Sequence, residues 1–200
     1  MGIKTALITG ASSGIGHAIS LHLLSEGYYV VATSRSFEKL QSSFERGTLT
    51  NPNFKLLQMD VSDSRDIKMA FQKLECENIS VDVLINNAGY GLTGLLETMS
   101  SDEIWRQFQT NVFGLMEVTR SVLPSMKAKN MGKIINIGSV LGRFSIPWNG
   151  AYSASKFAVE GFSESLRYEL RGSGIFVSVI EPGLFDTGFR NNQIESNGVT

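Results

Sequence analysis

The sequence has few of the residues that form disulfides and metal centres. It contains one cysteine, Cys76, and two histidines, His17 and His22, among its 200 residues. One cysteine cannot form an internal disulfide, and without a CxxC pair or a His/Cys cluster the usual metal-binding patterns are missing. We therefore expect no bound metal, and we expect Cys76 to be a small, partly buried residue near a helix end.

Charge of one sign and long apolar runs are missing as well. The 18 Lys and Arg residues nearly balance the 19 Asp and Glu residues, which gives a net charge of −1. Nucleic-acid binding normally requires a strongly basic face, so no nucleic-acid partner is expected. The longest apolar runs are far shorter than a membrane helix, and no secretory leader is recognisable. We expect a cytoplasmic protein that forms a single domain over residues 1–200.

What the sequence does contain is an alternation of short apolar, β-branched runs with longer helical patterns. Strands are predicted at residues 5–9, 28–33, 54–59, 81–86, 133–138 and 175–180. Helices are predicted at residues 15–27, 37–46, 64–77, 100–126 and around 151–161. Ser100 and Glu103 have the spacing of a capping box. The order predicts an α/β fold, a Rossmann-like, doubly wound parallel sheet between two helix layers, with ligands beyond the carboxyl ends of the strands.

The first strand-to-helix loop, "TGASSGIG" at residues 9–16, is rich in glycine. Gly10, Gly14 and Gly16 allow a tight turn and a close backbone approach, and the following helix offers free N–H groups to a phosphate. The spacing is neither GxGxxG nor that of a P-loop. A glycine-rich turn without a ligand is the alternative, but the position between the first strand and the first helix favours dinucleotide binding.

The end of the second predicted strand carries Ser34 and Arg35. A Rossmann site that selects NAD places an acidic residue there to hold the ribose 2′-hydroxyl. A guanidinium instead matches a 2′-phosphate, although an exposed arginine at a strand end is also common. We therefore predict NADP(H) in preference to NAD(H).

Further motifs follow along the chain: "NNAG" at residues 86–89, then Asn111, Ser139, and Tyr152 four residues before Lys156. Taken alone, Tyr152 and Lys156 are consistent with two surface residues of a helix, and Ser139 is consistent with a simple turn serine. A hydrolase nucleophile is disfavoured at Ser139, because the GxSxG pattern of hydrolases is not satisfied. Together with TGxxxGxG, the set resembles the classical short-chain dehydrogenase/reductase family over essentially the whole chain. Ser139 precedes Tyr152 by 13 positions, which matches the family's usual spacing.

The resemblance implies two groups of site residues. The catalytic residues would be Asn111, Ser139, Tyr152 and Lys156. The cofactor-binding residues would be Gly10, Ser12, Ser13, Gly14, Ile15, Gly16, Ser34, Arg35, Asp60, Val61, Asn87, Ala88, Gly89, Tyr152, Lys156, Pro182, Gly183 and Thr187.

The chemistry of the catalytic set can also be argued from its side chains. A phenol with a pKa of about 10 is a poor base near neutral pH. A nearby ammonium stabilises the phenolate, so Lys156 could tune Tyr152, and Ser139 could orient a substrate oxygen. By resemblance, Asn111 kinks its helix and holds a water in a proton relay to Lys156. We predict an NADP(H)-dependent oxidoreductase that interconverts a secondary alcohol and a ketone or aldehyde. The alternative is a catalytically idle NADP(H)-binding regulatory protein on the same fold.

The substrate side is predicted less directly. Leu92, Phe144, Ile146, Trp148 and Phe185 would form an apolar mouth, which suggests an apolar alcohol or carbonyl substrate. Members of the family usually continue through a substrate-covering lid and a last strand, and we expect these parts to lie beyond the end of this chain. The resemblance also implies a homodimer or homotetramer, formed through the helix that contains the small residues Ala151, Ala154, Ala158 and Gly161 and through the long helix before it.

Overall fold

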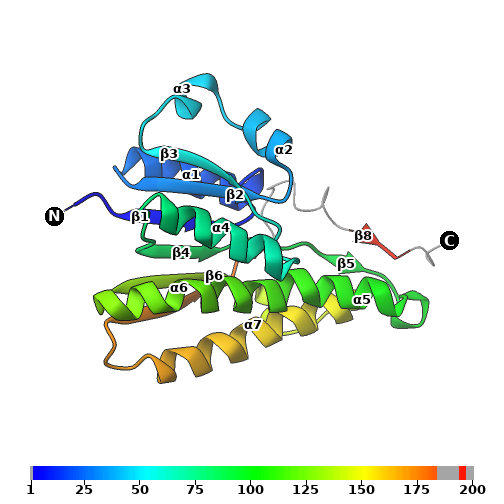
Figure 1. Ribbon diagram of the computed structural model, residues 1–200. Coiled ribbons are helices and arrows are strands. Elements are labelled where there is room, and N and C mark those ends of the chain that lie inside the picture. The colour runs from blue at the N-terminus through cyan, green and yellow to red at the C-terminus, as the bar shows by residue number, and fades with distance from the viewer. Residues whose placement is uncertain (1, 184–193, 197–200) are drawn as a thin grey trace.

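A six-stranded parallel sheet forms the centre of the computed structural model (Figure 1), which describes residues 2–183 and 194–196. Its strands are β1 (Thr5–Ile8), β2 (Tyr29–Ser34), β3 (Phe54–Gln58), β4 (Val83–Asn86), β6 (Gly132–Ile137) and β7 (Ile175–Ile180). They lie in the order β3-β2-β1-β4-β6-β7, with every neighbouring pair parallel. From β1 the chain adds β2 and β3 on one side of the sheet and β4, β6 and β7 on the other. This is the doubly wound topology that the sequence predicts, and the prediction is confirmed.

The helices follow the strands in the predicted alternation. They are α1 (Gly14–Ser25), α2 (Phe37–Ser42), α3 (Arg46–Leu49), α4 (Ser64–Cys76), α5 (Ser101–Phe108), α6 (Leu115–Lys129) and α7 (Gly150–Glu169). Short helical segments are η1 (Leu96–Thr98), the π-helical η2 (Gln109–Gly114) and η3 (Val140–Gly142). A separate two-stranded pair joins β5 (Leu92–Thr93) to β8 (Ile194–Glu195), and these strands lie side by side in Figure 1.

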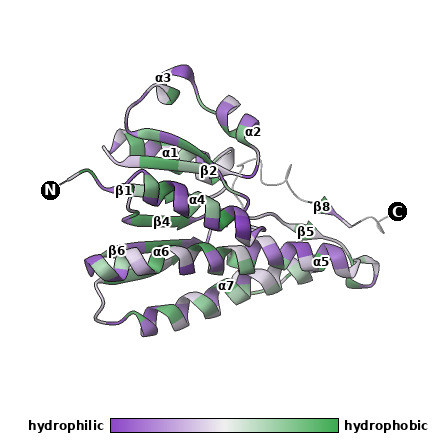
Figure 2. Ribbon diagram, in the orientation of Figure 1, coloured by the Kyte–Doolittle hydropathy of each residue, from purple (hydrophilic) through white to green (hydrophobic). Residues whose placement is uncertain are grey.

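The core consists of two apolar layers, one on each face of the sheet. Residues of α4, α6 and α7, such as Leu74, Val122 and Leu166, pack against one face. Residues of α1 and α2, such as Ile19 and Leu40, pack against the other. In Figure 2 the central strands are largely hydrophobic, while the outer helices carry hydrophilic residues between hydrophobic ones. Buried strands of this kind need helices on both faces, which explains the three layers.

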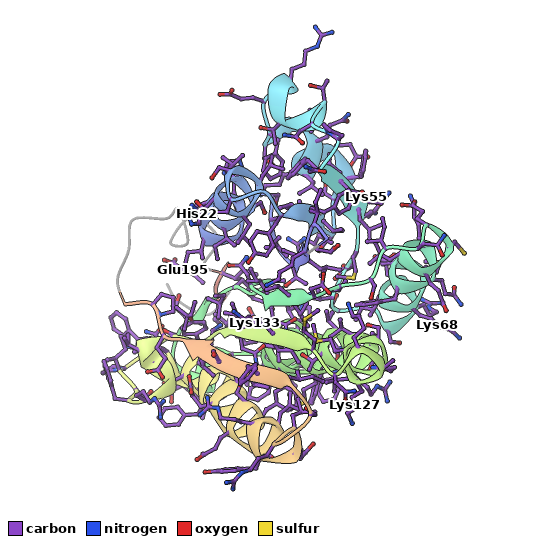
Figure 3. The ribbon with its side chains drawn as sticks, turned by 90° about the vertical axis from the view of Figure 1, so that its left-hand side faces the viewer. His22, Lys55, Lys68, Lys127, Lys133 and Glu195 are labelled. Atoms are coloured by element: carbon purple, nitrogen blue, oxygen red, sulfur yellow. The ribbon has the colours of Figure 1, made fainter. Side chains whose placement is uncertain are left out.

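Local interactions fix several helix starts and element contacts. At α5 the predicted capping box is confirmed: Ser100 Oγ accepts from the Glu103 N–H at 3.2 Å, and Glu103 Oε2 accepts from the Ser100 N–H at 2.8 Å. Asp63 caps α4 by accepting from the Arg65 N–H at 2.8 Å. Lys55, which Figure 3 labels on β3, pairs with Glu77 after α4 at 2.7 Å. The ion pair ties the end of α4 to the strand that precedes it.

The predicted helix at residues 37–46 is wrong, because the segment forms two short helices. Ser43 Oγ donates to the Leu40 carbonyl at 2.7 Å and uses a terminal carbonyl of α2. Phe44 turns inward, stacks on His17 at 4.5 Å and meets Phe54 edge-on at 4.8 Å between ring centroids. Burial of this ring outweighs continuation of the helix, and α3 begins only at Arg46.

The predicted helix at 100–126 is interrupted by η2 and extends to Lys129. A side-chain carbon at Gly114 would overlap the carbonyl of Val61, so glycine permits the close packing of η2 against the loop after β3. The expected partial burial of Cys76 is also wrong, because this last residue of α4 is exposed. None of the helices in the described part of the chain is long and apolar enough to cross a bilayer.

Candidate functional site

The loops after the carboxyl ends of the sheet strands enclose a cavity of about 1120 Å³. Most residues that the sequence predicts for the site line it: Gly10, Ser12, Ser13, Gly14, Ile15, Ser34, Arg35, Asp60, Val61, Asn87, Ala88, Gly89, Ser139, Tyr152, Lys156, Pro182 and Gly183. Gly16 and Asn111 lie behind its wall, while Thr187 falls outside the described residues. The topology brings these distant segments together because parallel strands end at the same edge.

The glycine-rich loop is braced by the loop after β4. Gly10 and Gly14 have positive φ angles of +66° and +55°, which glycine adopts without strain. Asn87 Nδ2 donates to the carbonyls of Thr9 at 2.9 Å and Gly10 at 3.0 Å. A side-chain carbon at Gly16 would overlap the Asn87 amide and lie 2.6 Å from the Gly10 carbonyl oxygen. The glycines therefore permit both the turn and its contact with Asn87.

The start of α1 is suited to an anion. Ser13, its N-cap residue, makes no side-chain capping hydrogen bond within the described part of the chain. The first N–H groups of a helix lack intrahelical partners and lie at the positive end of the helix dipole. Because this end of α1 borders the cavity through Ser13, Gly14 and Ile15, it can receive the phosphates of a dinucleotide.

Cations gather at the end of β2. Arg35 and Lys39 are exposed and both line the cavity, while Ser34 is buried with its hydroxyl 3.4 Å from that of Ser12. Lys39 was not among the predicted site residues; it lies in α2, four positions after Arg35. Gln58 Nε2 donates to the Arg35 carbonyl at 3.1 Å and fixes the backbone at this corner. The arrangement suits a phosphate on the ribose.

Asp60, after β3, and Tyr90, after β4, both line the cavity. Asp60 Oδ1 accepts from the Ser62 N–H at 2.9 Å and from its hydroxyl at 2.7 Å. Burial raises the pKa of the Tyr90 phenol, and the positive charges of Arg106 and Arg35 act against that rise. Two guanidinium groups therefore border the cavity near Tyr90, Arg35 directly after β2 and Arg106 in α5.

Tyr152 and Lys156 occupy the first turns of α7 and are both buried. Lys156 Nζ lies 5.8 Å from the centroid of the Tyr152 ring and donates to the Ile137 carbonyl at 2.8 Å. Burial lowers the pKa of Lys156 to about 8, and the negative charge of Glu160 opposes this change. Burial raises the pKa of Tyr152, and a hydrogen bond with the Ser139 side chain lowers it. The three polar groups converge at the cavity wall.

Asn111 positions this group from behind. Its Nδ2 donates to the Tyr90 carbonyl at 2.9 Å and to Ser155 Oγ at 3.2 Å, and its Oδ1 accepts from the Tyr90 N–H at 3.1 Å. Ser155 Oγ in turn donates to the Tyr152 carbonyl at 2.7 Å. The side chain thus joins η2 to the first turn of α7 and to the loop after β4. The water relay expected for Asn111 stays a prediction.

The apolar mouth is only partly as predicted. Leu92, Phe144 and Ile146 line the cavity, and Ile194 of β8 joins them. Trp148 does not line it; this residue has a φ of +66°, is exposed, and accepts from the Gly94 N–H at 2.8 Å. Phe185, the remaining predicted residue, lies outside the described residues. Apolar side chains of β5, of the segment between η3 and α7, and of β8 thus border the same cavity as Tyr152.

The cavity fits a nicotinamide dinucleotide. Its volume exceeds the 300–1,000 Å³ that is typical for a drug-sized ligand, which leaves space for a substrate beside the cofactor. The positive-φ glycines, the start of α1 and Arg35 supply a backbone cradle and charge for phosphates. Across residues 2–183 and 194–196, no group of three His, Cys, Asp or Glu side chains could hold a metal ion.

A family model described as short chain dehydrogenase matches residues 4–198. The chain belongs to this family. Its three-dimensional structure is also similar to those of solved family members. Serine dehydrogenase complexed with NADP+ is 36% identical, with a TM-score of 0.87 over 94% of this chain and 75% of that one. A member from Burkholderia phymatum in complex with NAD is 31% identical, with a TM-score of 0.89 over 95% of this chain and 69% of that one.

Curated family members are similar over most of the present chain. A 3-ketodihydrosphingosine reductase of Bacteroides thetaiotaomicron is 42% identical over 94% of this chain and 66% of its own length. Human retinol dehydrogenase 8 is 40% identical over 93% of this chain and 60% of its own length. The chain therefore spans about two thirds of the length of these relatives. The resemblance inferred from the motifs is confirmed at the level of the family.

Proposed function

We propose that this chain carries the catalytic site of an NADP(H)-dependent oxidoreductase that interconverts a secondary alcohol and a ketone or aldehyde. The observation that carries the proposal is the convergence of Ser139, Tyr152 and Lys156 at the wall of a cavity that also contains the glycine-rich loop. A binding protein without catalysis has no need for two hydroxyls and a buried ammonium at one point. The names of the two curated relatives, a reductase and a dehydrogenase, support the same class of reaction.

The choice of NADP(H) rests on charge at the end of β2. Arg35 and Lys39 line the cavity where the ribose of the adenosine would lie, and no acidic residue follows β2 directly. A guanidinium and an ammonium gain more from a 2′-phosphate than from a hydroxyl. The two solved family members contain NADP+ in one case and NAD in the other, so family membership alone does not select the cofactor.

In the reducing direction, the residues of this chain would bind the carbonyl oxygen of the substrate and supply its proton. The carbonyl oxygen would accept hydrogen bonds from Ser139 and Tyr152, which orients the carbonyl carbon toward the cofactor side of the cavity. When bound, the nicotinamide supplies a hydride. Tyr152 gives its proton to the developing alkoxide, and the positive charge of Lys156 stabilises the resulting phenolate. In the oxidising direction the phenolate removes the alcohol proton.

For the substrate we propose an apolar alcohol or carbonyl compound. Leu92 is buried at the cavity wall, while Phe144, Ile146 and Ile194 are about half exposed at its rim, with exposed fractions of 54%, 45% and 48%. Apolar side chains on a cavity rim favour an apolar ligand because its binding removes their surface from water. The named substrates of the two curated relatives, a ketodihydrosphingosine and retinol, are consistent with this class.

The proposal also includes a cytoplasmic homo-oligomer, either a dimer or a tetramer. Trp105 and Phe113 of the α5–η2 segment are exposed, with their ring centroids 5.7 Å apart and their planes tilted, and Phe157 of α7 is exposed as well. Burial of such rings between subunits would be favourable. Sedimentation velocity would test the assembly.

A cofactor titration followed by a turnover assay tests the proposed function. The chain should bind NADPH more tightly than NADH, and it should oxidise NADPH in the presence of at least one member of a panel of apolar ketones and aldehydes. Tyr152→Phe should keep NADPH affinity within about twofold and lose at least about 100-fold in turnover, because it removes only the acid–base hydroxyl. Undiminished turnover in Tyr152→Phe would contradict the assigned chemistry. NADPH binding without turnover on any substrate would favour the regulatory alternative.

A further inference from the structure

Arg143 connects three segments around the catalytic group. It directly follows η3, the short helix for which Ser139 is the N-cap residue. Its Nε and Nη2 donate to Glu181 Oε1 at 3.0 Å and 2.7 Å, and its Nη2 lies 3.5 Å from Glu160 Oε2. Glu181 follows β7, and Glu160 lies one helical turn after Lys156 on α7. The Arg143 guanidinium thus links η3 to the segment after β7 and to α7, the helix that carries Tyr152 and Lys156.

The three segments are packed without spare room. The Val140 N–H donates to the Pro182 carbonyl at 3.1 Å, and the Gly138 N–H donates to the Ile180 carbonyl at 2.8 Å. A side-chain carbon on Gly142 would lie 3.1 Å from the Lys156 carbonyl oxygen, and one on Gly138 would lie 2.8 Å from Glu160 Oε1. A displacement of η3 would therefore collide with α7 or break its hydrogen bonds with the segment after β7.

Arg143 offsets part of the negative charge of Glu160 and Glu181, and Arg167 and Lys156 also act on Glu160. Burial and the charge of Glu181 both raise the pKa of the Glu160 carboxyl, while the Arg143 charge acts in the opposite direction. The hydrogen bond from Arg143 lowers the pKa of Glu181. Without the guanidinium, two carboxylates would repel each other at the junction of the three segments. The Glu160 side chain is only 14% exposed, so water could screen this repulsion only weakly.

We propose that Arg143 is a positioning residue for the hydride-transfer site. By holding Glu181 and Glu160 together, it keeps Ser139 and the Pro182–Gly183 segment in register with Tyr152 and Lys156. This inference rests on the proposed function for its consequence in turnover, whereas the link itself is a property of the fold. The Arg143 side chain is 62% exposed, so its ion pairs contribute little to global stability. Its loss should therefore affect the site more than the fold.

The first test replaces Arg143 with Met, which keeps an unbranched, flexible side chain and removes the charge and the donors. We expect a loss of about tenfold in kcat with NADPH, since small displacements of positioned groups cost this much or more. The unfolding midpoint should change by less than about 3 °C. Arg143→Lys should recover part of kcat, because an ammonium keeps the positive charge but not the two donors, Nε and Nη2, of the planar guanidinium. Arg171→Met, in the exposed turn after α7, is the matched control and should retain wild-type kcat.

Charge reversal and hydrogen exchange separate positioning from a general structural effect. Arg143→Glu should lose more kcat than Arg143→Met, and adding Glu181→Arg should restore at least about threefold of that loss if the pair is what matters. In Arg143→Met, the amides of Val140 and Leu141 should exchange faster, while those of β1 remain unchanged. This measurement needs neither cofactor nor substrate.

The outcomes distinguish the two proposals. If the wild-type chain neither binds NADPH nor turns over a substrate, the proposed function fails, and faster exchange at Val140 in Arg143→Met still supports the link. If the wild-type chain is active and Arg143→Met matches it in kcat and in hydrogen exchange, the positioning role is overturned. A loss of kcat in Arg143→Glu that Glu181→Arg does not reduce would overturn the pairing with Glu181.

Discussion

At the scale of single residues, the proposed chemistry depends on a lysine that the fold keeps away from water. Lys156 is buried and donates to the Ile137 carbonyl, and its burial lowers its pKa to about 8. The ammonium is therefore largely present at neutral pH and is lost as the pH rises through about 8. The charge of Glu160, one turn further along α7, favours the protonated form. Reduction of a carbonyl should require this protonated form, since it stabilises the phenolate of Tyr152.

We predict that Glu160→Gln moves the alkaline limb of kcat/KM for carbonyl reduction to lower pH. Removal of the carboxylate charge removes a force that holds the Lys156 proton, so the limb should shift downward by about half a unit to one unit. The measurement is a pH profile of kcat/KM with NADPH, which reports the free enzyme. Glu164→Gln, an exposed position on the next turn, is the control and should leave the limb in place. An unchanged limb in Glu160→Gln would contradict the coupling.

The site residues that could be predicted from the sequence are those whose type and spacing are unusual. Tyr152, Lys156 and Ser139 are named by a motif, and the structure brings them to one wall of the cavity. Lys39 and Arg106 line the same cavity but lie on helices, where Lys and Arg are common and carry no signal of position. Their role follows only from how α2 and α5 are placed beside the sheet, and helix placement depends on contacts between distant residues.

At the scale of elements, the α5–η2–α6 segment holds the loop after β4 in place. Gln107 is fully buried; its Oε1 accepts from the Leu92 N–H at 2.7 Å, and its Nε2 donates to the Tyr90 carbonyl at 2.7 Å. Asn111, four positions later, contacts both backbone groups of Tyr90. Two amides thus satisfy a stretch of irregular backbone that borders the cavity.

We predict that Gln107→Leu lowers the free energy of unfolding by about 1–3 kcal/mol, because it leaves the Leu92 N–H without its buried partner and removes one of the two side-chain donors to the Tyr90 carbonyl, the other being Asn111. Urea unfolding followed by circular dichroism would measure the change. Gln107→Glu keeps an acceptor for Leu92 but loses the donor to Tyr90, so we expect an intermediate loss. Gln72→Leu, at an exposed position of α4, should stay within about 0.5 kcal/mol of the wild type. Equal stability of Gln107→Leu and the wild type would show that this amide does not hold the loop.

The predicted elements were right where the local pattern decides and wrong where a distant contact decides. The buried runs of β1, β4 and β6 have the apolar composition of strands that are covered on both faces. The break after Ser42 depends on the packing of Phe44 against His17 and Phe54. The π-helical η2 depends on the close approach of Gly114 to Val61. Neither contact can be read from a window of ten residues.

At the scale of the whole molecule, the switch of direction at β1 places the glycine-rich loop and the catalytic helix at one edge of the sheet. Connections from β1 lead through α1 to β2 on one side, while β4, β6 and β7 follow on the other. The loops at the switch diverge and leave a crevice between them. The sequence predicts this arrangement because right-handed crossovers leave few topologies for six strands that alternate with helices.

A dinucleotide that fills this crevice touches loops from most of the sheet, so its binding should stabilise the whole fold. With NADPH at about 100 times its dissociation constant, the expected gain is about 2.7 kcal/mol, which corresponds to roughly 5–10 °C in the unfolding midpoint of a chain of this size. Differential scanning fluorimetry across a range of NADPH and NADH concentrations would measure it. Arg35→Asp should reduce the NADPH shift and leave or increase the NADH shift, because the carboxylate repels a 2′-phosphate and accepts from a 2′-hydroxyl. If NADPH and NADH shift the wild type equally, and Arg35→Asp changes neither, the predicted cofactor preference is wrong even though a dinucleotide binds.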